Sequence, residues 1–85
     1  MSDVSMLEGK KILIVDDEPD ILAVLEELLD MCELVKASTY EEAKTCLESQ
    51  RFDIAVLDIM GVDGYGLLEL ANQKNIPALM LTAHA

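Results

Sequence analysis

The sequence has 85 residues, which is enough for one small domain and excludes a second one. Hydrophobic residues make up 52% of the chain, but no apolar run approaches the roughly 18 residues that a membrane-spanning helix requires. Six basic residues stand against 17 acidic ones, and the resulting net charge of −11 repels phosphate backbones, which argues against direct binding of nucleic acid.

The first nine residues and the two cysteines indicate the compartment. Residues 1–9 include Asp3 and Glu8 and lack the basic region and apolar core of a secretory signal. Cys32 and Cys46 form no C-x-x-C pair, so we expect buried free thiols in place of a disulfide or a metal clip. The sequence therefore predicts a cytoplasmic protein without membrane contact.

The first two predicted elements are a strand at Lys11–Val15 and a helix at Pro19–Met31. The strand is a short apolar run, which is typical of a parallel strand that is covered on both faces. Proline in the first turn of a helix costs no hydrogen bond, because the first amide groups have no partner within the helix. The helix is expected to bury one stripe of apolar side chains, namely Ile21, Leu25, Leu28 and Leu29.

The next two predicted elements are a strand at Leu34–Ala37 and a helix that begins after Thr39 and runs to about Glu48. Lys36 interrupts the apolar run of the strand and therefore indicates a sheet edge, where a charge prevents mispairing. Thr39 and Glu42 have the spacing of a capping box, which opens a helix. The helix is expected to turn three residues inward, namely Ala43, Cys46 and Leu47.

The last three predicted elements are a strand at Ile54–Leu57, a helix at Tyr65–Gln73 and a strand at Ala78–Leu81. The helix is expected to bury Leu67, Leu68 and either Leu70 or Ala71. Strands and helices thus alternate along the chain, which is the signature of βαβ units. Right-handed crossovers turn this order into a doubly wound parallel sheet, in which ligands collect beyond the carboxyl ends of the strands.

Acidic residues follow two of the predicted strands. Asp16, Asp17 and Glu18 come directly after the first strand, and Asp58 comes directly after the third. If those strands are neighbours, about 4.8 Å separates them, so the carboxylates repel one another unless a cation bridges them. Mg²⁺ prefers oxygen ligands of this kind. The sequence therefore predicts a Mg²⁺ site at this edge of the sheet.

A simpler interpretation of Asp16 and Asp17 is that they lead into the following helix. Acidic side chains favour the positive end of a helix dipole, and aspartate is a common N-cap. The metal interpretation is favoured because Asp58 and Thr82 also follow predicted strands, at the positions where a parallel sheet displays its site.

Four short motifs cover most of the chain after Gly9. They are Ile12-Leu13-Ile14-Val15-Asp16-Asp17-Glu18, Val56-Leu57-Asp58-Ile59-Met60, Asp63-Gly64-Tyr65 and Leu81-Thr82-Ala83. In this order and spacing they resemble the receiver domain of the response regulators of two-component signalling. The resemblance implies an α/β fold, a flavodoxin-like doubly wound parallel sheet with four strands and three helices. It also implies a phosphoprotein that acts in a phosphorelay.

The resemblance implies a role for each site residue. Asp58 is the phosphoacceptor, which takes a phosphoryl group from a histidine kinase or a phosphotransfer protein. Asp17 ligates Mg²⁺ directly and Asp16 through water, and Asp58 and the backbone carbonyl of Met60 complete the protein ligands. Thr82 is the switch hydroxyl that turns toward the phosphoryl group; without Asp58, its simpler interpretation is a β-branched residue that suits a strand. Catalysis is limited to self-phosphorylation and autodephosphorylation.

The resemblance is incomplete at two places. Receiver domains have roughly 120 residues, five strands and five helices. Residues 10–85 are therefore expected to be a partial receiver domain that lacks the fourth helix, the fifth strand with its lysine and the fifth helix, and residues 1–9 are expected to be an N-terminal extension. The segment from Asp58 to Gly64 is shorter than usual and has no proline. An apolar edge left open at Ala78–Leu81 predicts self-association.

Two other functions stay open at this point. The chain could be a receiver that is not phosphorylated and serves as a dimerisation or docking module, which the missing lysine favours. It could also be a haloacid-dehalogenase-like phosphatase, which uses an aspartyl phosphate with Mg²⁺. That family has a second acid two residues after its nucleophile. Met60 occupies this position after Asp58, and Glu18 occupies it after Asp16, so the phosphatase is the weaker alternative.

Overall fold

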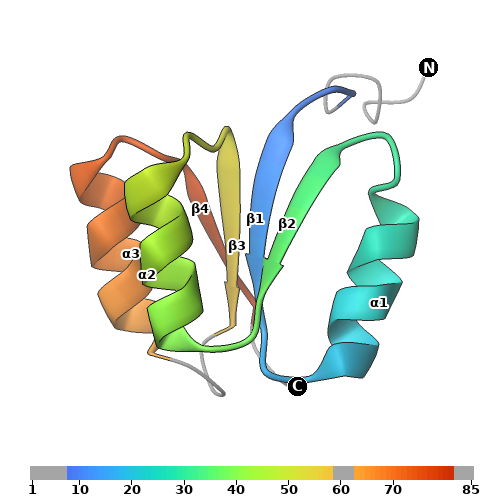
Figure 1. Cartoon of the computed structure of the whole chain (residues 1–85), viewed down its shortest axis with the longest axis horizontal. Coiled ribbons are helices and arrows are strands. Elements are labelled where there is room, and N and C mark those ends of the chain that lie inside the picture. Colours follow the sequence, from blue (N-terminus) through green and yellow to red (C-terminus); the bar gives the residue numbers. More distant parts are fainter. Residues whose placement is uncertain (1–7, 59–62, 82–85) are drawn as a thin grey trace.

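The computed structural model describes residues 8–58 and 63–81, and Figure 1 shows their arrangement. The elements in chain order are β1 (Lys11–Val15), α1 (Pro19–Leu28), β2 (Glu33–Ala37), α2 (Tyr40–Ser49), β3 (Ile54–Asp58), α3 (Gly64–Gln73) and β4 (Ala78–Leu81). Every predicted element is present, and the predicted boundaries differ from the observed ones by at most three residues. None of the helices in these two ranges has the length and apolar character needed to cross a bilayer.

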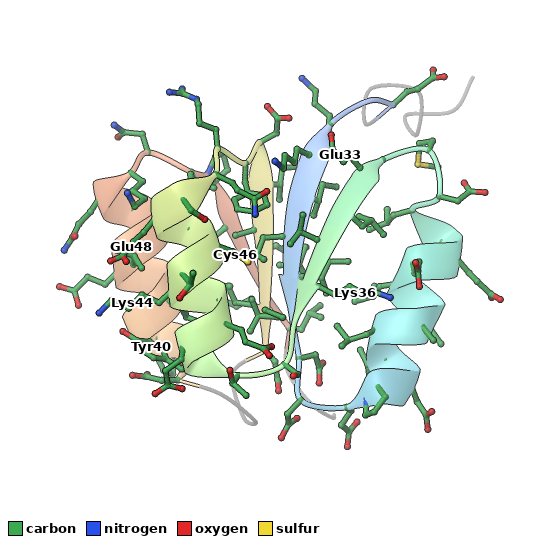
Figure 2. All side chains as sticks on the ribbon, viewed as in Figure 1. Glu33, Lys36, Tyr40, Lys44, Cys46 and Glu48 are labelled. Carbon is green, nitrogen blue, oxygen red and sulfur yellow. The ribbon has the colours of Figure 1, made fainter. Side chains whose placement is uncertain are left out.

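The four strands form one parallel sheet in the order β2-β1-β3-β4. This order confirms the predicted doubly wound α/β fold with four strands and three helices. β2 lies at one edge, as Lys36 indicated. Figure 2 shows Lys36 extending toward α1, where its Nζ lies 2.9 Å from Oε1 of Glu26. Both side chains are exposed, so this ion pair contributes little to stability.

Helices cover both faces of the sheet. Side chains alternate along β1, so Leu13 and Val15 point to one face, whereas Ile12 and Ile14 point to the other. α2 and α3 cover the face of Leu13 with four fully buried residues, namely Ala43, Leu47, Leu67 and Ala71. α1 covers the opposite face and lies apart from the other two helices in Figure 1. Burial on both sides explains the unbroken apolar runs of the central strands.

The predicted apolar stripe of α1 is partly wrong. Leu25 and Leu29 pack against the sheet as expected, and Leu22 packs beside them. Ile21 and Leu28 are instead 37% and 65% exposed. Apolar residues surround much of this helix, so two overlapping stripes fit the sequence equally well. The sheet covers only one of them.

The end of α1 also differs from the prediction. The helix ends at Leu28, three residues before Met31. The amide of Cys32 then donates to the carbonyl of Leu29, and the amide of Gly9 donates to the carbonyl of Met31. These hydrogen bonds turn the chain toward β2, which starts in register with β1, so the helix stops early.

The predicted capping box of α2 is confirmed. The hydroxyl of Thr39 accepts the amide of Glu42 at 3.1 Å, and the carboxylate of Glu42 accepts the amide of Ser38 at 2.9 Å. The hydrogen bond from the Ser38 amide, supported by the Ser38 hydroxyl, lowers the pKa of Glu42. The Thr39 hydroxyl therefore satisfies a first-turn amide that the helix itself cannot satisfy, and the Glu42 carboxylate binds the amide of Ser38, the residue before the N-cap.

Two expectations about buried side chains are refined. In the part of the chain that the structure describes, neither Cys32 nor Cys46 is in a disulfide, and both side chains are half-buried where full burial was expected. Cys46 points inward, toward the core under α2, and Cys32 packs on the α1 side of the sheet. In α3, Leu67 and Ala71 are fully buried, whereas Leu68 is half-buried beside the same core, so Ala71 completes the inner face.

Candidate functional site

The predicted acidic residues meet at the carboxyl edge of the sheet. β1 and β3 are adjacent and Val15 is in register with Leu57, so Asp16 and Asp58 occupy equivalent positions on neighbouring strands. Asp17 is the next residue along the chain. One carboxylate oxygen from each of the three aspartates lies within 4.8 Å of the others. The predicted convergence is therefore confirmed.

Two of the three carboxyl groups are buried. Asp16 is 6% exposed and Asp58 is 4% exposed, and no other polar or charged residue in the described part of the chain is buried. Asp17 is exposed. The site therefore has a buried floor and one side that is open to solvent.

Hydrogen bonds hold Asp16 in place. Its amide donates to the carbonyl of Ala37 at 3.1 Å, which ties it to the end of β2. Its Oδ1 accepts the amide of Glu18 at 2.9 Å. Glu18 is the N-cap of α1 and makes no side-chain capping bond. Because Asp16 does not bind an amide within the helix, helix capping does not account for it, which counts against the simpler interpretation.

Burial raises the pKa of Asp16. Desolvation of the carboxyl group is the largest cause, and the negative charges of Asp58 and Asp17 add to it. The hydrogen bond from the amide of Glu18 acts in the opposite direction. Desolvation and the neighbouring negative charges both disfavour the ionised form of Asp16. A cation bound between the three aspartates would favour that ionised form.

The donor set fits a hard divalent cation. Mg²⁺ takes oxygen ligands in an octahedral arrangement and is bound in proteins by one or two carboxylates together with water and phosphate oxygens. Asp16, Asp17 and Asp58 could supply the carboxylate ligands. The predicted Met60 carbonyl ligand and the predicted Thr82 switch hydroxyl lie outside the described residues.

Sequence reasoning missed the role of Gly66 at the start of α3. Asp63 is the N-cap of this helix, and its Oδ1 accepts the amide of Gly66 at 3.0 Å. A Cβ atom at Gly66 would lie only 2.6 Å from Oδ2 of Asp63. Gly66 therefore leaves the space that the cap occupies. This role could have been identified from the sequence, because Gly66 stands three residues after an aspartate that opens a predicted helix.

Comparisons with known proteins agree with this arrangement. A family model described as the response regulator receiver domain matches residues 12–85. The chain is 46% identical over 82 residues to the "Probable transcriptional regulator ycf27" of Cyanophora paradoxa, covering 91% of this chain and 34% of that protein. It is 47% identical over 77 residues to the "Heme response regulator HssR" of Staphylococcus aureus (strain Newman), covering 84% of this chain and 34% of that protein.

Solved structures share the fold. A CheY-like response regulator receiver domain protein from Methanospirillum hungatei JF-1 has a TM-score of 0.81 at 31% identity, covering 91% of this chain and 66% of that chain. The non-phosphorylated HemR receiver domain from Leptospira biflexa has a TM-score of 0.78 at 34% identity, covering 91% of this chain and 67% of that chain. The chain thus spans about a third of the length of the curated relatives and about two thirds of these solved chains.

Proposed function

We propose, because this chain belongs to the response regulator receiver domain family, that Asp58 accepts a phosphoryl group beside Mg²⁺ and thereby switches an output. The observation that carries the proposal is the meeting of Asp16, Asp17 and Asp58 at one edge of the sheet. Members of this family generally have histidine kinases as partners and catalyse nothing beyond phosphotransfer. The family match also counts against a haloacid-dehalogenase-like phosphatase.

The chemistry starts from the carboxylate of Asp58. One of its oxygens attacks the phosphorus of a phosphohistidine on a histidine kinase or a phosphotransfer protein. The phosphorus–nitrogen bond breaks, the imidazole leaves with the electron pair, and Asp58 becomes an acyl phosphate. Mg²⁺, when bound, offsets the negative charge on the transferring group. Hydrolysis of the acyl phosphate by water restores the carboxylate.

The surroundings of the other two aspartates support different parts in holding the cation. One oxygen of Asp16 is already engaged by the amide of Glu18, which supports contact with Mg²⁺ through a water molecule. Asp17 is exposed, and one of its carboxylate oxygens lies within 4.8 Å of those of Asp16 and Asp58, which supports direct ligation. The carbonyl of Met60 is proposed as the remaining protein ligand.

Thr82 is proposed as the switch hydroxyl. Leu81, the residue before it, is in register with Asp58 in the pairing of β3 with β4. In a parallel sheet, residues that follow such a pair leave the sheet at the same edge. A hydroxyl there can donate a hydrogen bond to a phosphoryl oxygen and convert the new charge into a movement of the following segment.

Self-association through β4 is a further part of the proposal. Among the described residues, β4 pairs with β3 alone. It contains no charged residue, and Leu79 is 58% exposed. β2, at the opposite edge, carries exposed Glu33 and Lys36, and such charges oppose pairing between edges. A second copy of the chain could therefore pair with β4.

Intact-mass measurement after incubation with acetyl phosphate tests the function. With Mg²⁺, we expect the chain to gain the mass of one phosphoryl group, because acetate leaves as the carboxylate of Asp58 attacks. Removal of divalent cations with EDTA is expected to abolish the gain. Asp58→Asn removes the nucleophile while keeping the size of the side chain, and this variant is expected to stay unmodified.

Two controls separate this function from the docking alternative. Asp53→Asn makes the same charge change at an exposed aspartate outside the acidic site, and it is expected to be modified like the natural chain. Circular dichroism establishes that each variant is folded. A folded natural chain that gains no phosphoryl group under these conditions would favour the non-phosphorylated docking module.

A further inference from the structure

A cavity of about 400 Å³ lies at the amino edge of the sheet, at the opposite end of the strands from the acidic site. Residues 47–52, which lead from α2 to β3, and residues 74–76, which lead from α3 to β4, form its walls. These segments lie at the top of Figure 1. The volume is within the range of small-molecule sites, and the proposed phosphoryl chemistry uses none of the lining residues.

Cations outnumber carboxylates in this cavity. Arg51 and Lys74 line it together with one acid, Glu48, which projects from α2 on the side of α3 in Figure 2. The whole chain has the reverse balance, with six basic and 17 acidic residues. Arg51 and Lys74 are both exposed, so a ligand in the cavity can reach their charges.

The other lining residues suit the rest of a small organic molecule. The side-chain amides of Gln50 and Asn75 also line the cavity and offer hydrogen-bond donors and acceptors. Leu47, Phe52 and Ile76 are buried and form an apolar floor. Nζ of Lys11, which does not line the cavity, lies 5.4 Å from the centre of the Phe52 ring.

The position of each cation has a simpler explanation when it is taken alone. Arg51 and Lys74 follow the C-terminal ends of α2 and α3, where a positive charge stabilises the helix dipole. That explanation does not require the two cations to share one cavity. It also does not account for the two amides and the apolar floor that accompany them.

We propose that this cavity binds a small organic anion, with a phosphate or carboxylate group held by Arg51 and Lys74 and a small apolar or planar body beside Leu47, Phe52 and Ile76. Charge-assisted hydrogen bonds from cations to a phosphate or carboxylate are stronger than those between neutral groups, so the anion is the main recognised feature and the apolar contact is secondary. The site is separate from Asp58, so its occupancy and the phosphorylation of the chain can be measured independently.

Binding of phenyl phosphate and benzoate to the ¹⁵N-labelled chain tests the proposal. The titration is followed by NMR in EDTA, which keeps divalent cations away from the acidic site. We expect saturable shifts at residues 47–52 and 74–76 with a dissociation constant of about 1 mM or below. Phenol, which has the ring without the anion, is expected to bind at least about tenfold more weakly. The tighter of the two anions identifies the preferred charged group.

Two double variants with the same change in net charge provide the control. Arg51→Gln with Lys74→Gln is expected to weaken binding at least about tenfold. Lys10→Gln with Lys44→Gln changes two exposed cations that do not line the cavity, and it is expected to weaken binding less than about twofold. Absence of saturable binding, or equal weakening by both double variants, would overturn the proposal.

Discussion

The carboxyl groups of Asp16 and Asp58 are the buried charged groups of the acidic site, and their burial opposes folding. Each carboxylate loses hydration inside the protein and lies close to other acids. A protein that only needed stability would place apolar or amide side chains there. Buried acids of this kind are typical of sites that bind a cation or perform chemistry, where function is maintained at some loss of stability.

Asp16→Asn is expected to raise the free energy of unfolding at neutral pH when no divalent cation is present. The pKa of Asp16 in the folded chain lies above its ordinary value of 3.8. The stability that this group contributes is therefore present below pH 3.8 and is lost as the pH rises through the raised pKa. Asparagine stays neutral and can still accept the amide of Glu18.

Urea unfolding in EDTA between about pH 3 and pH 8 measures this difference between the natural chain and the variant. The difference in the free energy of unfolding is expected to vanish at the acidic end of the range, where Asp16 is protonated in both the folded and the unfolded chain. Asp30→Asn makes the same charge change at an exposed position and is expected to have little effect. If the Asp16→Asn variant is no more stable than the natural chain at neutral pH, the buried carboxylate of Asp16 does not oppose folding.

At the scale of elements, exposure decides which helix leucines stabilise the chain. Leu47 of α2 is 1% exposed, whereas Leu28 of α1 is 65% exposed. We expect Leu47→Ala to lower the free energy of unfolding by about 2–5 kcal/mol. Leu28→Ala is expected to change it by no more than about 0.5 kcal/mol. Urea unfolding measures both, and equal losses would show that α1 buries the stripe that contains Leu28.

The start of α3 couples Asp63 to Gly66. Asp63→Ala removes the N-cap and is expected to lower the free energy of unfolding by about 1 kcal/mol. Gly66→Ala gains about 1 kcal/mol of helix propensity, but its Cβ atom must displace the carboxylate of Asp63, so the net change in the natural chain is expected to be small. In the Asp63→Ala background nothing is displaced, and the same substitution is expected to stabilise the chain by about 1 kcal/mol.

Thermal or urea unfolding of the two single variants and the double variant completes this cycle. The coupling between the two residues is the difference between the effects of Gly66→Ala in the two backgrounds. Additive effects would mean that the side chain of Asp63 moves aside without losing its hydrogen bond to the amide of residue 66.

At the scale of the whole molecule, the two edges of the sheet differ in how they oppose association. Sedimentation velocity of the natural chain over a range of concentrations is expected to show a dimer that grows with concentration. Leu79→Lys places a charge on β4, and this variant is expected to stay monomeric. Leu28→Lys places the same charge on an exposed apolar residue of α1 and serves as the control. A natural chain that stays monomeric would contradict self-association.

Much of the fold and the core of the acidic site could be predicted from the sequence. The strands were identifiable because the runs at β1 and β3 are apolar on both faces, and Lys36 marked β2 as an edge. The acidic site followed from position alone. The carboxyl ends of neighbouring parallel strands meet at one edge, so Asp16 and Asp58 had to lie close together once β1 and β3 were adjacent.

Only the tertiary structure decided features that depend on contacts between distant segments. It selected the stripe of α1 with Leu22 in place of Leu28, because the sheet covers one side of a helix that is apolar around much of its surface. It buried Asp16 and left Asp17 exposed, although the two are neighbours in sequence. It also brought Arg51 and Lys74 to one cavity from separate loops. Local patterns determine the elements of this protein, whereas packing between them determines which side chains meet.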